Sequence, residues 1–411
     1  MSRAVQVLEE IQARRALPDG LTVIDAPPAP PPKRFGRRRS ELVETILSHA
    51  SEPTIELSLG ADAIASVRLG ATVVLIGASG RGKTSLATTI AVEHAQGRGP
   101  AIAMSLELPE DELAARAIGT RCDASWPEVL GGTLTRERML QALPERFSVI
   151  ERQHATLSAL ETEIDAMRKE YPVEPILVAV DYVQLVPGES EDEPRMRVDA
   201  AMRALDHIAR SRRVVVLALS QGSRASAKAL SSGELLGAQT TDAGAESAAI
   251  ERWASLTLAI GEHGPEAEDG SCATSISIGK YRMGKGDVVL PARYHGRSGL
   301  WRLTGDAKPA AEVRAERQDA RTEASIATLM LAVRGAVEQS ATPLSDRQLG
   351  ELVTGKAVLR RQARARLLAD PDSGIVECGR QSGGRKPSYP VWTRTRAKAA
   401  GLPIHDGEAD S

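Results

Sequence analysis

One run constrains this chain more than any other feature: GASGRGKTS, from Gly77 to Ser85. It matches the pattern G-x-x-x-x-G-K-[ST], and it lies between an apolar run that ends at Ile76 and a helical segment that begins at Thr84. Glycines in such a loop let successive backbone N–H groups face a phosphate chain, with a helix N-terminus behind them. The pattern therefore predicts an ATP site in which Lys83 reaches the β and γ oxygens and Thr84 binds Mg²⁺. The expected phosphate-binding residues are Gly77, Ala78, Ser79, Gly80, Arg81, Gly82, Lys83, Thr84 and Ser85.

The fold class follows from the apolar runs around this loop. From Ala71 to about Thr304, short runs such as ATVVLIGA, PILVAVD and RRVVVLALSQ alternate with helix-like segments. Near-continuous Val, Ile, Leu and Ala runs are typical of strands that are buried on both faces of a parallel sheet. The sequence predicts an α/β fold, with a mainly parallel sheet covered by helices.

Two acidic residues stand where such a sheet binds ligands, at the carboxyl ends of its strands. Asp181 ends the run PILVAVD, and we expect it to hold the metal through water. Glu107 follows a run that ends at Met104, and it is the candidate to activate the attacking water. The alternative for both is an ordinary acid that caps a helix or stabilises its dipole.

A second cationic feature is ISIGKYRMGKGDVVL, from Ile276 to Leu290. It alternates like a strand and then presents Lys280, Arg282 and Lys285 around two glycines. Three cations at one predicted hairpin tip need an anionic partner. The alternative is that they only keep an edge hairpin soluble.

Length, charge and cysteine content narrow the class of protein. A chain of 411 residues is long enough for two or three domains. Its formal charge of -2 restricts any DNA contact to local patches. The three cysteines lie far apart, which predicts a reducing, cytoplasmic compartment. No run approaches the roughly 18 apolar residues of a membrane span, and we expect no membrane contact.

Composition shifts divide the chain into five segments. The first holds DAPPAPPPKRFGRRR, which is too rich in proline for a helix, and the fourth segment follows a charged, alanine-rich stretch without an apolar face. The expected segments are 1–51, a proline-rich basic linker and short helix; 52–306, the ATPase domain; 307–324, a charged linker; 325–400, a winged-helix DNA-binding domain; and 401–411, a disordered tail.

The expectation for 325–400 depends on element order and charge. Three helical patterns precede two strand-like runs around a Gly-Gly tip, as in a winged helix. From Arg334 to Lys398 there are 13 Lys plus Arg against 6 Asp plus Glu, which favours duplex DNA as the partner. The alternative is a winged helix used for protein contacts. The expected DNA-binding residues are Arg360, Arg361 and Arg364 in the third helix, and Arg385 and Lys386 at the tip.

Several motifs together resemble one known family. They are GASGRGKTS, MSLELPEDELAAR, VDYVQL, VVVLALSQ and GKYRMGKGD, in this order. Over roughly residues 52–304 the chain resembles the ATPase domain of DnaB-type hexameric replicative helicases. The resemblance implies a RecA-like P-loop fold, a homo-oligomeric ring, expected to be a hexamer, and ATP-driven movement on single-stranded DNA. The family's helical N-terminal domain has no counterpart in the first 51 residues.

The resemblance also implies roles for single residues. Glu107 activates water, Asp181 holds the metal, and Gln221 senses the γ-phosphate. Lys280 and Arg282 stand where the family places cations that act on the ATP of a neighbouring subunit. The remaining roles that it implies are nucleotide binding for Arg116, and single-stranded DNA binding for Arg224 and Lys228.

These expectations lead to two functional hypotheses. The first is an ATP-dependent DNA helicase or translocase that acts as a ring in the replication of a phage, plasmid or other mobile element. The alternative is an ATP-switched DNA-binding protein for replication initiation or regulation, which does not separate strands. A recombination or clock-type RecA relative is a third, more distant hypothesis.

Overall fold

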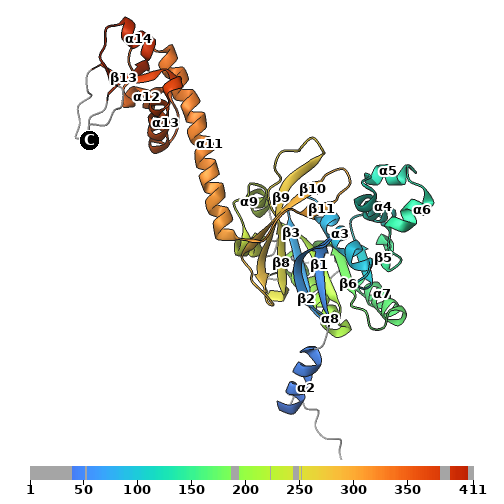
Figure 1. Ribbon diagram of the computed structural model, residues 1–411. Coiled ribbons are helices and arrows are strands. Elements are labelled where there is room, and N and C mark those ends of the chain that lie inside the picture. The colour runs from blue at the N-terminus through green and yellow to red at the C-terminus, as the bar shows by residue number, and fades with distance from the viewer. Residues whose placement is uncertain are drawn as a thin grey trace, which may run out of the picture. The chain divides into compact units, whose positions relative to one another are not determined.

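The computed structural model describes residues 39–50, 53–186, 194–222, 224–243, 250, 252–379 and 389–405, without the side chains of 48–50, 194–195, 224–225 and 242–243 (Figure 1). The chain divides into two units, Met1–Glu52 and Pro53–Ser411. In the first unit, helix α2 (Arg39–Ala50) is described. The predicted proline-rich linker up to residue 38, and residues 406–411 of the predicted tail, lie outside the described residues.

The second unit is organised around a sheet of ten strands in the order β11-β10-β9-β8-β3-β7-β6-β4-β5, with β12 paired to β10. The strands from β8 to β5 in this order are parallel, whereas β9, β10, β11 and β12 are antiparallel to their neighbours. The predicted α/β fold with a mainly parallel sheet is confirmed. The strands are β3 (Thr72–Gly77), β4 (Ala101–Ser105), β5 (Phe147–Ile150), β6 (Leu177–Asp181), β7 (Val215–Gln221), β8 (Leu256–Ile260), β9 (Ser271–Tyr281), β10 (Val288–His295), β11 (Trp301–Leu303) and β12 (Lys308–Pro309).

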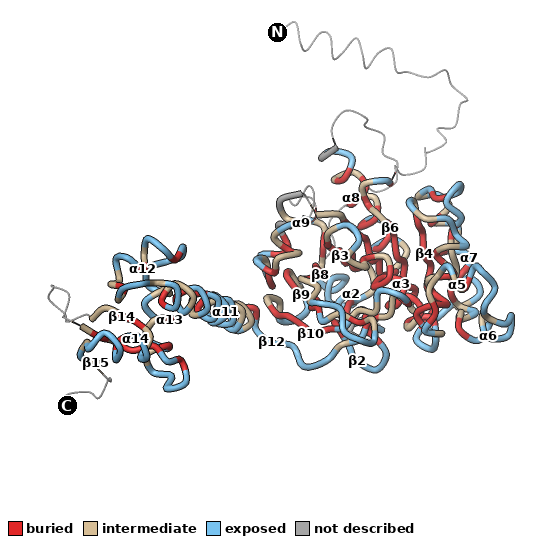
Figure 2. The backbone as a smooth tube through the Cα atoms, turned by 90° about the horizontal axis from the view of Figure 1, so that it is seen from above, coloured by how far each residue is buried: buried red, intermediate tan, exposed pale blue. Residues whose placement is uncertain are grey.

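Two apolar layers cover the sheet, which explains why its central strands are apolar along their whole length. Every residue of β3, β4, β6 and β8 is buried (Figure 2). One layer joins helix α3 (Lys83–Ala95) to a separate hairpin of β1 (Thr54–Leu59) and β2 (Asp62–Arg68). The other layer is formed by α7 (Leu157–Glu170) and α8 (Pro194–Arg212). Removal of this apolar surface from water is the main source of stability.

Smaller elements connect these layers. Helix α4 packs with two short helices around a separate apolar cluster that includes Ile118 and Val129. A 3-10 helix, η3 (Gly237–Ala243), lies against β8 and β9. The helices are α4 (Glu110–Cys122), α5 (Trp126–Leu130), α6 (Arg136–Ala142) and α9 (Arg224–Ser231).

The predicted charged linker 307–324 is not a separate segment, because it forms the first part of one long helix, α11 (Ala310–Gln339). Its first turn is fixed to the ATPase region, since Ala310 is fully buried beside Leu236 and Val289. Three arginines spaced along one side of α11 then donate to backbone carbonyls of the segment before η3. The pairs are Arg314 with Leu236, Arg317 with Gly233, and Arg321 with Ser232.

The last part of the chain has its own apolar core. The second half of α11 packs with α12 (Asp346–Leu352), α13 (Ala357–Ala369) and a three-stranded sheet of order β14-β13-β15. Its strands are β13 (Ile375–Cys378), β14 (Val391–Thr393) and β15 (Ile404–His405), and α14 (Arg394–Ala399) follows β14. The predicted Gly-Gly tip lies outside the described residues. Among the described helices, none is long and apolar enough to cross a membrane.

Candidate active site

The phosphate loop connects β3 to α3 at the carboxyl edge of the sheet. Gly80 and Gly82 have φ angles of 73° and 80°, a backbone region that favours glycine. Gly82 is also the N-cap of α3 and supplies no side-chain cap, so the first N–H groups of the helix stay available to an anion. The loop therefore has both the shape and the donors for a phosphate chain.

Lys83 occupies the first position of α3 and is 8% exposed. Its Nζ donates to the carbonyl oxygen of Ala78 at 2.9 Å. Burial lowers the pKa of Lys83, whereas the negative charges of Asp181 and Glu107 raise it. Among the described residues this ammonium has no ion pair within 4.0 Å. A buried cation with only a carbonyl partner is well suited to an incoming phosphate.

Thr84 and Asp181 meet directly, since the Oγ1 of Thr84 donates to the Oδ2 of Asp181 at 2.6 Å. Asp181 is the last residue of β6 and is 7% exposed. Burial raises its pKa, the hydrogen bond from Thr84 lowers it, and the charge of Glu107 raises it further. The described residues contain no cluster of three His, Cys, Asp or Glu side chains. One hydroxyl and one carboxylate fit Mg²⁺, which binds few protein oxygens and completes its shell with water and phosphates.

Glu107 lies in the loop between β4 and α4 and is exposed. The loop is tied to the end of β6, because the N–H of Leu106 donates to the carbonyl of Asp181 at 2.7 Å. The N–H of Leu108 donates to the Oγ of Ser105 at 2.9 Å. Burial raises the pKa of Tyr182, and so does the negative charge of Glu107. The structure thus brings the predicted water-activating carboxylate to the same mouth as the predicted phosphate and metal residues.

Gln221 ends β7 in register with Gly77, which places it beside the start of the phosphate loop. Behind it, the amide of Gln184 donates to the Oγ of Ser220 at 3.1 Å. The Oε1 of Gln184 is buried without a hydrogen-bond partner among the described residues. A buried acceptor without a donor is uncommon. Gln184 belongs to the motif VDYVQL, but sequence reasoning assigned it no separate role.

A pocket beside Ser85 contains residues that the sequence did not single out. It is lined by Ser85, Arg116, Trp126, Tyr294, Arg297 and Gly299. The guanidinium of Arg116 pairs with Glu112 at 2.6 Å and lies 5.3 Å from the ring centroid of Trp126. Arg116 is therefore near the nucleotide site, and its charge is already balanced. Trp126 and Tyr294 come from segments far apart in the sequence, so no spacing pattern could have joined them.

Tyr294 and Trp301 also support the phosphate loop from below. Their ring centroids are 4.9 Å apart. A Cβ at Gly82 would lie 3.0 Å from the ring of Tyr294 and 3.1 Å from that of Trp301. Gly82 is thus required by close approach as well as by its backbone angle.

Lys280 and Arg282 do not join this site. The end of β9 pairs with the start of β8, where Tyr281 is in register with Leu256 and Leu256 with Val73. The N–H of Arg282 donates to Ser255, the residue just before β8. Both cations therefore lie at the edge of the sheet opposite Gly77.

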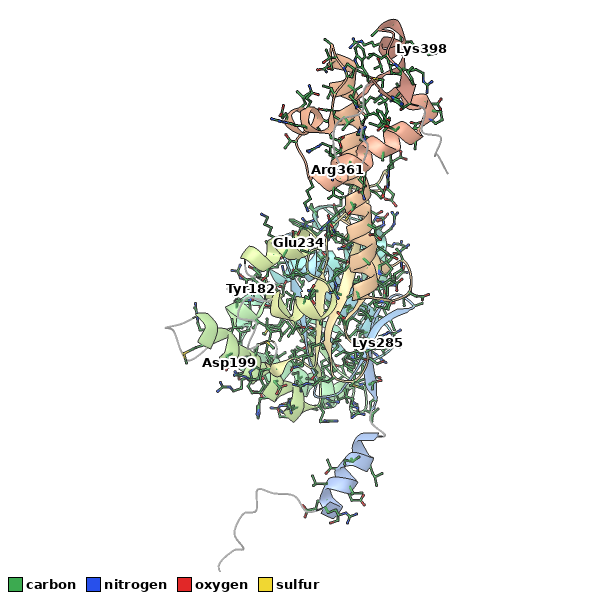
Figure 3. The ribbon with its side chains drawn as sticks, turned by 90° about the vertical axis from the view of Figure 1, so that its left-hand side faces the viewer. Tyr182, Asp199, Glu234, Lys285, Arg361 and Lys398 are labelled. Carbon is green, nitrogen blue, oxygen red and sulfur yellow. The ribbon has the colours of Figure 1, made fainter. Side chains whose placement is uncertain are left out.

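The predicted DNA-binding residues differ in their surroundings. The side chain of Arg224, and all of Arg385 and Lys386, lie outside the described residues. Lys228 is exposed on α9. On α13, Arg360 donates to the carbonyls of Val353 and Gly355 at 3.1 Å, and Arg364 pairs with Glu377 at 2.6 Å. Arg361 is exposed on the same helix (Figure 3).

Comparison with known proteins identifies one family. The family model of the DnaB-like helicase C-terminal domain matches residues 62–294. The chain is similar in fold to the solved ATPase domain of a DnaB-like helicase, with 19% identity and a TM-score of 0.50, over 58% of this chain and 86% of that one. No curated protein sequence matches.

Two further structures match more weakly. One is a DnaB-like replicative helicase studied with primase, with 19% identity and a TM-score of 0.49, over 57% of this chain and 59% of that one. The other is a KaiC-like protein of Pyrococcus horikoshii, with 12% identity and a TM-score of 0.41, over 62% and 100%.

Proposed function

Because the chain belongs to the DnaB-like helicase C-terminal domain family and is an ATP-hydrolysing DNA helicase, we propose that it works as a homo-oligomeric ring on single-stranded DNA, with each ATP bound between neighbouring subunits. By resemblance to the family the ring is a hexamer. The replication of a phage, plasmid or other mobile element is the setting that we propose for it.

The observation that carries this proposal is the distance along the sheet between the two halves of the site. From Thr72 to Gly77, β3 spans about 16 Å at roughly 3.3 Å per residue. Arg282 lies at the Thr72 end, because it donates to Ser255, whose own N–H donates to Thr72 at 2.7 Å. Its side chain cannot cover that span and also reach the phosphates held by Lys83. A second copy of the chain, docked edge to edge, supplies what one subunit lacks.

Each residue of the composite site then has a definite task. Lys83 and the loop N–H groups bind the β- and γ-phosphates, and Thr84 and Asp181 hold Mg²⁺, which when bound neutralises phosphate charge. Glu107 accepts a proton from the attacking water. Gln221, beside Gly77 at the end of β7, contacts the γ-phosphate. Arg282 of the neighbouring subunit, assisted by Lys280, stabilises the charge that develops on the transferred phosphoryl group.

The pocket beside Ser85 accommodates the base and ribose. Ser85 follows the two residues that bind phosphate and metal, so the rest of the nucleotide extends toward it. Trp126 and Tyr294 offer aromatic faces for a base. Arg116 lies over Trp126 and closes the pocket while its pairing with Glu112 keeps it in place. This assigns Arg116 to the nucleotide site through packing rather than through phosphate binding.

Two parts of the chain contact DNA in this proposal. Lys228 and Arg224, on α9, face single-stranded DNA in the ring. The domain from about 325 to 400 is a winged helix that binds duplex DNA, because its element order is that of a winged helix and its sequence has an excess of cations. Arg361 is the α13 arginine with an exposed side chain and no ion pair among the described residues. It is the leading phosphate or base contact of α13, whereas Arg360 and Arg364 hold the domain together.

A strand-displacement assay on forked DNA tests the function. The wild-type protein should release the labelled strand only with ATP and Mg²⁺, and a Glu107→Gln protein should bind the fork without releasing it. If wild-type protein hydrolyses ATP on DNA yet releases no strand from forks of either polarity, the protein is an ATP-switched DNA-binding protein for initiation or regulation instead.

A further inference from the structure

The strand that carries Lys280 and Arg282 is irregular just before these residues. In the pairing of β8 with β9, Leu258 is in register with Ile278 and Leu256 with Tyr281. Thr257 alone therefore stands opposite two residues, Gly279 and Lys280. This is the arrangement of a β-bulge, in which one extra residue reverses the alternation of side chains and re-aims those that follow.

The surroundings of Gly279 explain why the bulge forms there. A Cβ on Gly279 would lie 2.5 Å from the Oγ1 of Thr241 and 2.7 Å from that of Thr257. The N–H of Lys280 donates to the Oγ1 of Thr257 at 2.8 Å. Only glycine fits this position, and the threonine hydroxyl satisfies the N–H group that the bulge displaces from the ladder.

The bulge brings the Tyr281 ring onto the face of the sheet that carries Ile278. Both residues pack against the same apolar layer, together with β1 and β2. At that face the hydroxyl of Tyr281 donates to the carbonyl of Ser66 at 2.6 Å and accepts from the N–H of Ser66 at 3.3 Å. The phenol is thus fixed at both its donor and its acceptor to the backbone of β2.

The hairpin turn that follows is shaped around the same ring. A Cβ on Gly284 would lie 2.3 Å from the Cε1 of Tyr281, so the turn closes directly onto the ring. A Cβ on Gly286 would lie 2.3 Å from the carbonyl oxygen of Gly279. The turn carries Lys285 (Figure 3). Tyr281 is therefore held from below by β2 and from the side by the turn.

With Tyr281 fixed, the next residue must point to the opposite face of the strand. The guanidinium of Arg282 does so, since it donates at 3.2 Å to the carbonyl of Arg252, next to residues of the other apolar layer. Its only described partner is a neutral carbonyl on an exposed surface. The Arg282 charge is thus held in one direction and is still available to an anion.

We propose that Tyr281 is a positioning residue for the trans-acting Arg282, holding the bulged end of β9 through Ser66 so that the guanidinium is presented to the ATP of the neighbouring subunit. This inference rests on the proposed function. It assigns to Tyr281 an effect on catalysis in the next subunit and none on nucleotide binding in its own.

The test uses the full chain with Tyr281→Phe, which removes the hydroxyl and keeps the ring. We expect kcat for ATP hydrolysis to fall about five- to tenfold, the size of effect expected of one lost hydrogen bond, with the Kd for a fluorescent ATP analogue unchanged. Gly284→Ala, which displaces the ring, should give the same pattern. Tyr171→Phe and Gly97→Ala, a tyrosine and a glycine away from the hairpin, are the matched controls and should leave kcat unchanged.

Mixing separates positioning from a purely structural role. Tyr281→Phe subunits keep an intact phosphate loop, and Lys83→Ala subunits keep an intact hairpin, so mixed rings should recover ATPase activity. A wild-type kcat for Tyr281→Phe, or a loss that mixing does not rescue, overturns the inference, provided that Arg282→Ala is rescued by the same partner. If Arg282→Ala is not rescued either, the composite site itself is wrong, and the inference fails with it.

Discussion

The phosphate loop and helix α13 both present cations, but the two regions use them differently. Lys83 is buried and bonded to one neutral carbonyl, so its charge is left for a ligand. On α13, Arg364 is 14% exposed and pairs with Glu377 and Asp346, and Arg366 pairs with Glu323 of α11. The availability of a cation is therefore decided by its partners and not by its place in a basic run.

The difference has a physical origin. A buried ammonium loses hydration that only an anion or several dipoles can replace, so the site around Lys83 favours a phosphate. An arginine in a small domain with few apolar residues often connects elements instead, because its planar fork can bond two groups at once. The same kind of charge is thus a ligand-binding group in one region and a structural group in the other.

The largest expected effect concerns catalysis at the phosphate site. In Glu107→Gln the carboxylate that accepts a proton from water is lost while the phosphate-binding groups remain. Turnover should fall by about 10² to 10⁴, whereas the Kd for ATP should stay within about twofold. The matched control is Glu110→Gln, in the first turn of α4. Wild-type turnover in the Glu107 variant would remove this residue from the mechanism.

A second effect should appear in the stability of the C-terminal part. In Arg364→Ala the carboxylates of Glu377 and Asp346 lose their partner, and the local free energy of unfolding should fall by about 2 to 3 kcal/mol. Hydrogen exchange of α13 and β13 in the full chain measures this loss. Protection equal to that of the wild type would contradict a structural role for Arg364.

The converse is expected for Arg361, whose side chain supports no contact within the described part of the domain. Arg361→Ala should leave hydrogen exchange unchanged and weaken duplex DNA binding about five- to tenfold, with the salt slope reduced by about one. Fluorescence anisotropy over a series of salt concentrations measures both. Arg334→Ala, on α11, is the control. Unchanged affinity in Arg361→Ala would turn α13 into a surface for protein contacts.

The smallest effect concerns His263, which packs against Tyr294 and Trp301 beside the phosphate loop. Burial lowers the pKa of His263 to about 4 from 6.5, and the charge of Arg81 also lowers it. The unfolded chain therefore binds this proton more tightly, so stability is complete above the ordinary histidine pKa and decreases as the pH falls toward about 4.

Denaturant unfolding at two pH values measures this dependence. Between about pH 7 and pH 5 the wild type should lose about 1 kcal/mol more stability than His263→Gln, after allowance for solvent screening. An equal loss in both proteins would show that His263 takes up its proton as easily when folded as when unfolded.

The sequence predicted the fold and most of the phosphate site because both depend on short-range order. Lys83, Thr84 and the loop glycines follow one another along the chain, and Asp181 and Glu107 follow apolar runs whose carboxyl ends meet in any parallel sheet. Trp126, Tyr294 and Gln184 could not be assigned, since they reach the site only through the order of the strands and the packing of distant segments.

The environment of a cation was equally hidden from the sequence. Arg360 and Arg361 are adjacent, yet one bonds two backbone carbonyls and the other is exposed. The β-bulge that directs Tyr281 and Arg282 to opposite faces depends on Thr257, which is 23 residues before Lys280 in the chain. The predicted charged linker became part of α11 because its arginines find carbonyl partners at Ser232, Gly233 and Leu236.

The most direct test of the composite ATP site is an ATPase assay on mixed subunits. Lys83→Ala protein lacks the phosphate-binding charge, Arg282→Ala protein lacks the trans-acting charge, and each alone should be reduced by several orders of magnitude, about the contribution of an arginine finger. Mixed in equal amounts, they should form interfaces that pair an intact loop with an intact arginine, and activity should rise at least about tenfold above either protein alone. Normal hydrolysis by Arg282→Ala alone, or no recovery on mixing two variants that each still assemble, would contradict an ATP site shared between subunits.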